Sequence, residues 1–330
     1  MLAVAVAFAA LHVAHAQNAP PELPTLHLSA QLVLLDATVE DRKSGKVIEG
    51  LTPADFVLTE DGVPQPVTYV SEDRLPLSIS LLFDITDTVQ PVLKPLAAGS
   101  REFLSRLRPE DEVAVLTFSN HVSVLQPFTL DHSLVEAAIA HASTLHDRNS
   151  PTFIHESVYA ATEITEGATI PNSRRVEVWL TDGTSNYATG PISKMGNSRD
   201  RPDYIHSREE ATDRLTRSGA VVSVLIERSA ATDAQLPLMP LFGHVGEINR
   251  YAELSGGPVL HTARADVARN LAALIDILRH RYTLGFKPTV AKPPGTLCHL
   301  TLTLSPAYLA AHPNLPHRAI LIRSRQTYQR

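Results

Sequence analysis

The stretch that decides the fold is Leu77-Ser-Ile-Ser-Leu-Leu-Phe83, an apolar run that Asp84-Ile-Thr-Asp-Thr88 follows directly. A short apolar run bounded by polar residues is typical of a strand that is buried on both faces. The next residues, Gln90 to Leu107, repeat their apolar positions at helical spacing and end before Arg108-Pro109. We therefore expect a strand, a loop rich in oxygen atoms and a helix in direct succession.

The same alternation continues toward residue 281. We predict further strands at 112–118, 122–128, 176–180, 221–226 and 258–260, and helices at 133–142, 153–164, 206–217, 245–254 and 267–281. Strands that alternate with helices in this way imply a mostly parallel sheet covered by helices on both faces. The predicted fold class is therefore α/β, with a doubly wound, Rossmann-like sheet.

Both flanks of this region have alternating apolar and polar residues instead. The first flank predicts strands at 32–40 and 56–60, with the hairpin signal Asp61-Gly62, and the second predicts strands at 282–286, 299–304 and 319–323. Each flank has too few strands to bury a face alone. We therefore expect the N- and C-terminal flanks to build one small β module. The expected domains are 17–75, an N-terminal β module; 76–281, the α/β domain; and 282–330, a C-terminal β segment.

Composition excludes several classes of protein. The 330 residues are 44% hydrophobic and 19% charged, which is an ordinary globular mixture rather than that of a disordered chain. Lys and Arg number 29 against 35 Asp and Glu, so a basic surface for nucleic acid is not expected. Cys298 is the only cysteine, which excludes an intramolecular disulfide and a multi-cysteine zinc site.

The N-terminus predicts export. Leu2 to Val13 is an uncharged apolar run with the length of a signal-peptide core, too short to span a bilayer. Ala14-His15-Ala16 then supplies the small residues of a cleavage site, so residues 1–16 are the predicted signal peptide. The alternative is a buried N-terminal helix. We expect a bacterial protein of the periplasm or the extracellular space, without a transmembrane segment in the mature chain.

Polar groups gather where ligands bind in such folds, beyond the carboxyl ends of the strands. Asp84, Thr86 and Thr88 follow the first strand of the α/β region, Thr152 stands at the head of a predicted helix, and Asp182 follows the strand at 176–180. These side chains offer only hydroxyl and carboxylate oxygen atoms. Such a set suits a hard cation, and octahedral Mg²⁺ in particular.

These residues resemble a von Willebrand factor type A (VWA) domain with a metal-ion-dependent adhesion site. The family pattern is Asp-x-Ser-x-Ser, then a Thr, then an Asp before Gly, which maps onto the five residues just named. The resemblance implies that the threonines ligate Mg²⁺ (or Mn²⁺ or Ca²⁺) directly and that the aspartates hold ligand waters. It also implies a partner protein that offers an Asp or Glu to the ion.

The flanks extend the resemblance to roughly residues 25–328. Segments at 39–51, 55–56 and 60–65, together with Arg281-Tyr-Thr-Leu-Gly-Phe286 and the end at 323–328, are similar to exported VWFA-related proteins of acidobacterial type.

The sequence departs from the family pattern in ways that leave alternatives open. Thr86 and Thr88 replace serines, and Asp87 fills a position that usually holds a small residue. The site could therefore be degenerate in a purely structural envelope module, and Asp84, Thr86 and Thr152 could merely cap helices. A metal-dependent hydrolase is a further alternative. We expect no enzyme, because no catalytic motif places a general base.

Overall fold

A six-stranded sheet forms the centre of the α/β part, in the order β12-β10-β8-β5-β6-β7. Its strands are β5 (Leu77–Asp84), β6 (Glu112–Phe118), β7 (Val122–Thr129), β8 (Arg174–Thr181), β10 (Val221–Glu227) and β12 (Val259–Thr262). All neighbours are parallel except β6 and β7, which are antiparallel. The mostly parallel, doubly wound sheet predicted from the sequence is thereby confirmed.

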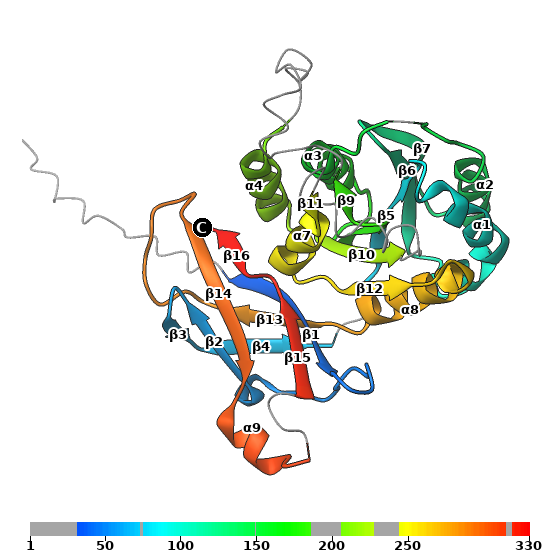
Figure 1. The fold of residues 1–330 in the computed structure, drawn as a ribbon. Helices are drawn as coiled ribbons and strands as arrows, with labels where there is room; N and C mark the ends of the chain where they lie inside the picture. Colours follow the sequence, from blue (N-terminus) through cyan, green and yellow to red (C-terminus); the bar gives the residue numbers. More distant parts are fainter. Residues whose placement is uncertain (1–31, 73–74, 149, 186–205, 228–243, 315–318) are drawn as a thin grey trace, which may run out of the picture. The chain divides into compact units, whose positions relative to one another are not determined.

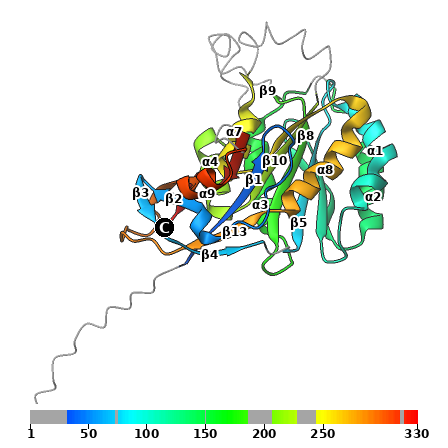
Figure 2. The ribbon, with the colours of Figure 1, turned by 90° about the horizontal axis from the view of Figure 1, so that it is seen from below.

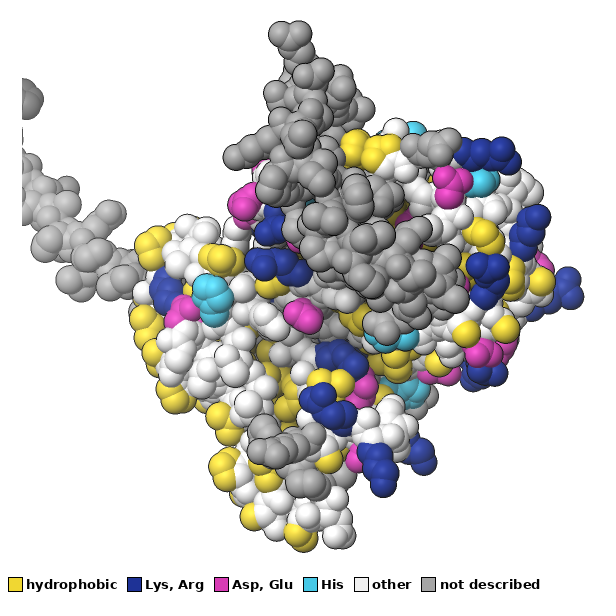
Figure 3. All heavy atoms as spheres, in the orientation of Figure 1, with side chains coloured by type: hydrophobic (Ala, Val, Ile, Leu, Met, Phe, Trp, Pro, Cys, Tyr) yellow, Lys and Arg dark blue, Asp and Glu magenta, His cyan; other side chains and the backbone are white. Residues whose placement is uncertain are grey.

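The structure, a computed structural model, describes residues 32–72, 75–148, 150–185, 206–227, 244–314 and 319–330. The predicted signal peptide, residues 1–16, lies outside these ranges. Among the described residues, no helix has both the length and the apolar character needed to cross a bilayer. Figure 3 shows basic and acidic side chains interspersed on the face in view.

Helices cover both faces of the central sheet (Figures 1 and 2). One face packs against α1 (Gln90–Leu104), α2 (His132–Ala142) and α8 (Val267–Arg279), whose apolar side chains form one core cluster with the sheet. The other face packs against α3 (Ile154–Glu166), α4 (Arg208–Ser218) and α7 (Glu247–Ser255) around a second cluster. The inner strands β5, β6 and β10 are rich in apolar residues because both of their faces are buried.

The two flanks together build the β module. Its sheets have the orders β15-β1-β13-β4 and β16-β14-β2-β3, so each sheet contains strands from both ends of the chain. The strands are β1 (Val33–Asp41), β2 (Phe56–Glu60), β3 (Val63–Gln65), β4 (Val67–Ser71), β13 (Tyr282–Phe286), β14 (Leu297–Leu304), β15 (Ile320–Ser324) and β16 (Thr327–Gln329). The two sheets share one apolar core. The β module that the sequence predicts from both flanks is therefore confirmed.

Local details differ from the sequence expectations. The Asp61-Gly62 turn closes a hairpin between β2 and β3, with both residues at positive φ (48° and 80°), as an Asp-Gly turn requires. β4 then leaves this hairpin and pairs with β13. Additional elements are the helix α9 (Pro306–Ala311), the 3₁₀ turns η1 (Pro53–Asp55) and η4 (Arg264–Asp266), and a short ladder of β9 (Thr184–Ser185) with β11 (His244–Val245).

One carboxyl group is buried in the centre of the parallel sheet. Glu177 of β8 accepts hydrogen bonds from the Thr162 hydroxyl at 2.9 Å and from the Trp179 indole N–H at 3.1 Å. The side chain is fully buried, and this burial raises the pKa of Glu177 to about 7.

This raised pKa predicts a pH-dependent stability. Between pH 4.5 and 7 the folded protein keeps a proton on Glu177 that the unfolded chain has lost, so stability falls as the pH rises through this interval. Glu177→Gln removes the titrating group, so the variant does not lose this stability as the pH rises. The variant should be more stable than wild type by on the order of 3 kcal/mol at pH 8 and nearly equal to it at pH 4.5. Urea unfolding at several pH values tests this, and a difference that is constant with pH would contradict it.

Candidate metal centre

Two buried aspartates lie at the carboxyl edge of the central sheet. Asp84 is the last residue of β5, and Asp182 directly follows β8. The two strands are parallel neighbours, with Phe83 opposite Leu180. Asp84 has no exposed surface and Asp182 is 5% exposed. The folded chain therefore brings both aspartates of the predicted site to one edge of the sheet.

Hydroxyl groups surround the carboxylate of Asp84. One carboxylate oxygen accepts hydrogen bonds from the Thr86 hydroxyl at 2.6 Å and from the Thr86 backbone N–H at 3.0 Å. The other accepts a bond from the Thr181 hydroxyl at 3.0 Å. Asp182 accepts a bond from the backbone N–H of Thr184 at 2.8 Å. These contacts hold both carboxylates in place among hydroxyl and backbone N–H groups.

Charge in this site is not balanced by a basic side chain. Burial raises the pKa of Asp84 above its usual range, and the charge of Asp182 raises it further, while hydrogen bonds from Thr86 and Thr181 oppose the rise. No ion pair joins either aspartate to a Lys, Arg or His among the residues that the structure describes. A buried acidic pair of this kind, with oxygen donors only, fits a divalent cation such as Mg²⁺.

The remaining predicted residues lie on adjacent loops. Thr152 is buried before α3, and the next residue, Phe153, donates its N–H to the Ser119 carbonyl at the end of β6. The same region is tied to the end of β5, because Asp147 donates its N–H to the carbonyl of Ile85 at 2.9 Å. Thr88 is half-buried in the turn that leads into α1. Contacts thus join Thr86 to Asp84 directly, whereas Thr88 lies farther toward the surface.

The helix-capping alternative is not supported by the contacts. α1 has Val89 at its N-cap and α3 has Phe153, and neither helix receives a side-chain cap. The carboxylate of Asp84 instead binds Thr86, two residues on, and the hydroxyl of Thr181 on the neighbouring strand.

The five predicted site residues leave out three further polar residues of this edge. Thr181 binds Asp84, Thr184 binds Asp182, and Glu227 is the last residue of β10, the strand next to β8. Glu227 fits the same description as Asp182, an acidic residue at the end of a parallel strand, but only the strand order of the folded protein places it beside Asp182.

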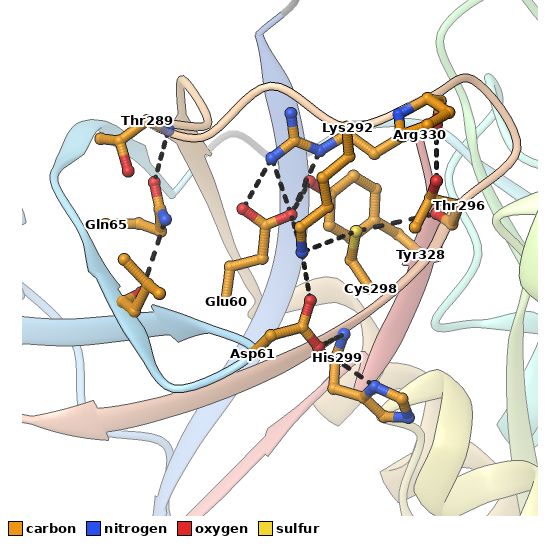
Figure 4. Close-up of polar contacts among 12 residues, drawn as sticks. Glu60, Asp61, Gln65, Thr289, Lys292, Thr296, Cys298, His299, Tyr328 and Arg330 are labelled. Carbon is orange, nitrogen blue, oxygen red and sulfur yellow. Dashed lines mark hydrogen bonds and ion pairs between the residues drawn. The ribbon is translucent and has the colours of Figure 1, made fainter.

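A second group of potential ligands lies in the β module. Glu60, Asp61 and Cys298 each place one ligand atom within 4.8 Å of the others (Figure 4). Arg330, however, binds both carboxylate oxygens of Glu60 at 2.9 and 2.8 Å, and Lys292 pairs with Asp61. The bond from Lys292 is the main reason that the pKa of Asp61 falls to about 2. We interpret this group as an ion-pair network that joins the strands of the module.

Comparisons with known proteins give distant structural likenesses. No family model and no curated protein matches the sequence. Similar solved structures include BatB from Bacteroides thetaiotaomicron, at 13% identity, covering 61% of this chain and 97% of that one, with a TM-score of 0.39. They also include the vWF domain of the type V pili tip protein Mfa5 from Porphyromonas gingivalis, at 11% identity, covering 62% and 95%, with a TM-score of 0.41. The PilB minor pilin from Streptococcus sanguinis matches at 10% identity over 64% and 63%, with a TM-score of 0.43.

These neighbours include proteins described as vWF or VWA domains. The α/β part of this chain has a mostly parallel sheet with helices on both faces. Likenesses at this level carry no argument about residue roles. The resemblance of the flanks to the acidobacterial-type family stays a prediction from the sequence.

Proposed function

We propose that this protein is an exported VWA-type binding protein that holds a divalent cation, Mg²⁺ or Mn²⁺, and captures a partner protein through it. The observation that carries the proposal is the buried pair Asp84 and Asp182, which no basic side chain neutralises among the described residues. Export is proposed from the apolar run and cleavage signal of residues 1–16.

The residues of the site have separate roles in this proposal. Thr86, Thr88 and Thr152 would offer hydroxyl oxygens to the ion, and Asp84 and Asp182 would accept hydrogen bonds from its water ligands. Thr86 already donates its proton to Asp84, so its lone pairs are available to a cation. When bound, the ion supplies an electrophilic position that accepts a carboxylate. Because neutral hydroxyls are its nearest donors, the site favours an Asp or Glu of the partner.

The proposal concerns binding rather than catalysis. A metal-dependent hydrolase needs a general base beside the ion and its substrate. The sequence has no motif that places such a base, and Asp84 and Asp182 are themselves committed to holding the ion.

An affinity experiment tests the proposal. Immobilised protein should retain a partner from bacterial envelope extract in millimolar Mg²⁺ and release it with chelator. Asp182→Asn, which keeps the size of the side chain but removes one charge, should lose the partner in both conditions. Retention that is equal with Mg²⁺, with chelator and in the Asn variant would contradict a metal-dependent interaction.

A further inference from the structure

A third carboxylate lies at the same edge of the sheet as the two aspartates. Glu227 ends β10, and the sheet order places β10, β8 and β5 side by side. Ile226 is the pairing partner of Thr181, so the residues that follow them, Glu227 and Asp182, are next to each other across the two strands. Acidic residues therefore stand at the ends of three consecutive parallel strands.

The side chains of Glu227 and Asp182 are expected on the same face of the sheet, whereas Asp84, two residues after Leu82 of the second apolar cluster, is expected on the other face. Leu225 and Leu180 are pairing partners and belong to the same apolar cluster, which packs against α1 and α8. Side chains two residues apart along a strand point to the same side. Glu227 follows Leu225 by two residues, and Asp182 follows Leu180 by two. The charge of Asp182 is accordingly one of the causes that raise the pKa of Glu227, next to its burial.

Two buried oxygen atoms beside Asp182 have no hydrogen-bond partner among the described residues. One is Oε2 of Glu227, a residue that is 1% exposed. The other is the hydroxyl oxygen of Thr184, a residue that is 5% exposed. Arg264 attracts Glu227 electrostatically, but no ion pair joins them in the described part of the chain. Buried polar atoms in native proteins nearly always have a hydrogen-bond partner. We therefore expect a partner for each of these two oxygen atoms.

We propose that Glu227 is a third carboxylate of the cation site and holds the ion through a water ligand. This inference rests on the proposed function. Glu227 stands one strand farther from Asp84 than Asp182 does, which suits an outer contact rather than direct ligation. A water ligand of the ion would satisfy Oε2, and a second would satisfy the Thr184 hydroxyl.

Mn²⁺ titration of the full chain by calorimetry tests the role of Glu227. Groups that orient metal ligands from outside typically change metal affinity by about 10- to 100-fold when they are removed. Glu227→Gln should therefore weaken Mn²⁺ binding about tenfold. The matched control is Glu177→Gln, the same substitution at another buried position of the same sheet, five residues before Asp182 and roughly 16 Å along the strand. It should change the affinity less than twofold.

The outcomes separate this inference from the proposed function. If the wild type binds Mn²⁺ and Glu227→Gln binds it as tightly as Glu177→Gln does, the role of Glu227 is overturned and the proposed cation site is unaffected. Absence of Mn²⁺ binding to the wild type would overturn the cation site and this inference with it. Unfolding in urea at pH 7, measured for each variant, shows whether a lower affinity comes with an intact fold. Tenfold weaker binding at a urea midpoint no lower than that of the wild type supports the role of Glu227.

Discussion

Replacing Asp84 with Asn is expected to abolish the thermal stabilisation that Mg²⁺ gives the wild-type protein. A ligand that binds only the folded state at about 100 times its Kd stabilises by about 2.7 kcal/mol. For a chain of this size, that corresponds to a rise in Tm on the order of 5 °C. Asn keeps the shape of the side chain but loses the negative charge that is buried beside Asp182. Differential scanning calorimetry with and without Mg²⁺ measures the shift.

Two matched variants make this test specific. Thr86→Ser keeps the hydroxyl that binds Asp84 and should retain the shift. Asp87→Asn removes a charge from the same loop, but Asp87 is exposed and pairs with His146, so this variant should also retain it. An equal Mg²⁺ shift in wild type and in Asp84→Asn would contradict the assigned site, and no shift in any of them would favour a degenerate one.

Removing residues 288–330 is expected to prevent folding to a soluble protein. The deletion takes away β14, β15 and β16, so β2 and β3 are left as an isolated hairpin and β1 becomes an open edge. An isolated two-stranded hairpin is marginally stable, and an open edge strand pairs readily with other chains. Glu40 and Glu60, both buried, also lose their partners Arg323 and Arg330.

The size of this effect follows from the apolar surface that is lost. Besides the small Cys298, five large side chains of the deleted segment are buried in the core of the module: Leu300, Leu302, Leu304, Ile320 and Tyr328. Burial of a large apolar side chain contributes about 1.5–3 kcal/mol, so together they contribute on the order of 10 kcal/mol. This is comparable with the whole stability of a typical domain, about 5–15 kcal/mol.

Expression followed by fractionation measures the outcome, with the fragment 1–287 expected in the insoluble fraction. Single substitutions on one strand provide the control. Leu300→Ser should reduce the soluble yield strongly because Leu300 is buried, whereas Leu297→Ser should not, since Leu297 is 49% exposed. A soluble fragment 1–287 that unfolds at the wild-type temperature would contradict a β module shared by both flanks.

The elements of the central sheet were predictable because their signal is local. The run from Leu77 to Phe83 is apolar except for Ser78 and Ser80, and β5 covers it and ends at Asp84. β6 and β10 likewise differ from their predicted bounds by no more than one residue. A strand that is buried on both faces can be recognised from its own residues, without knowledge of the neighbouring strands.

The pairing of the flanking strands was harder to predict in detail. β4 follows the β2–β3 hairpin in sequence but pairs with β13, which is more than 200 residues away: Leu284 lies opposite Val70. Nothing in the sequence of Val67–Ser71 shows whether this strand pairs with a strand next to it in the sequence or with one as distant as β13. β16 was missed because three residues are too few to show alternation.

The site was predictable in part for a related reason. Asp84 and Asp182 could be assigned to one place because parallel strands bring their carboxyl ends to one edge of the sheet. The order of the strands depends on long-range packing, so the sequence could not show that β10 lies beside β8. Without that order, Glu227 is one acidic residue after a strand like any other.

The most direct test of the cation site is a Mn²⁺ titration of the purified protein followed by electron paramagnetic resonance, with Mg²⁺ as competitor. The expected result is one bound Mn²⁺ per chain, displaced by Mg²⁺ and lost in both Asp84→Asn and Asp182→Asn. No bound Mn²⁺ at millimolar concentration, or Mn²⁺ that stays bound in both variants, would contradict a cation site at this edge of the sheet.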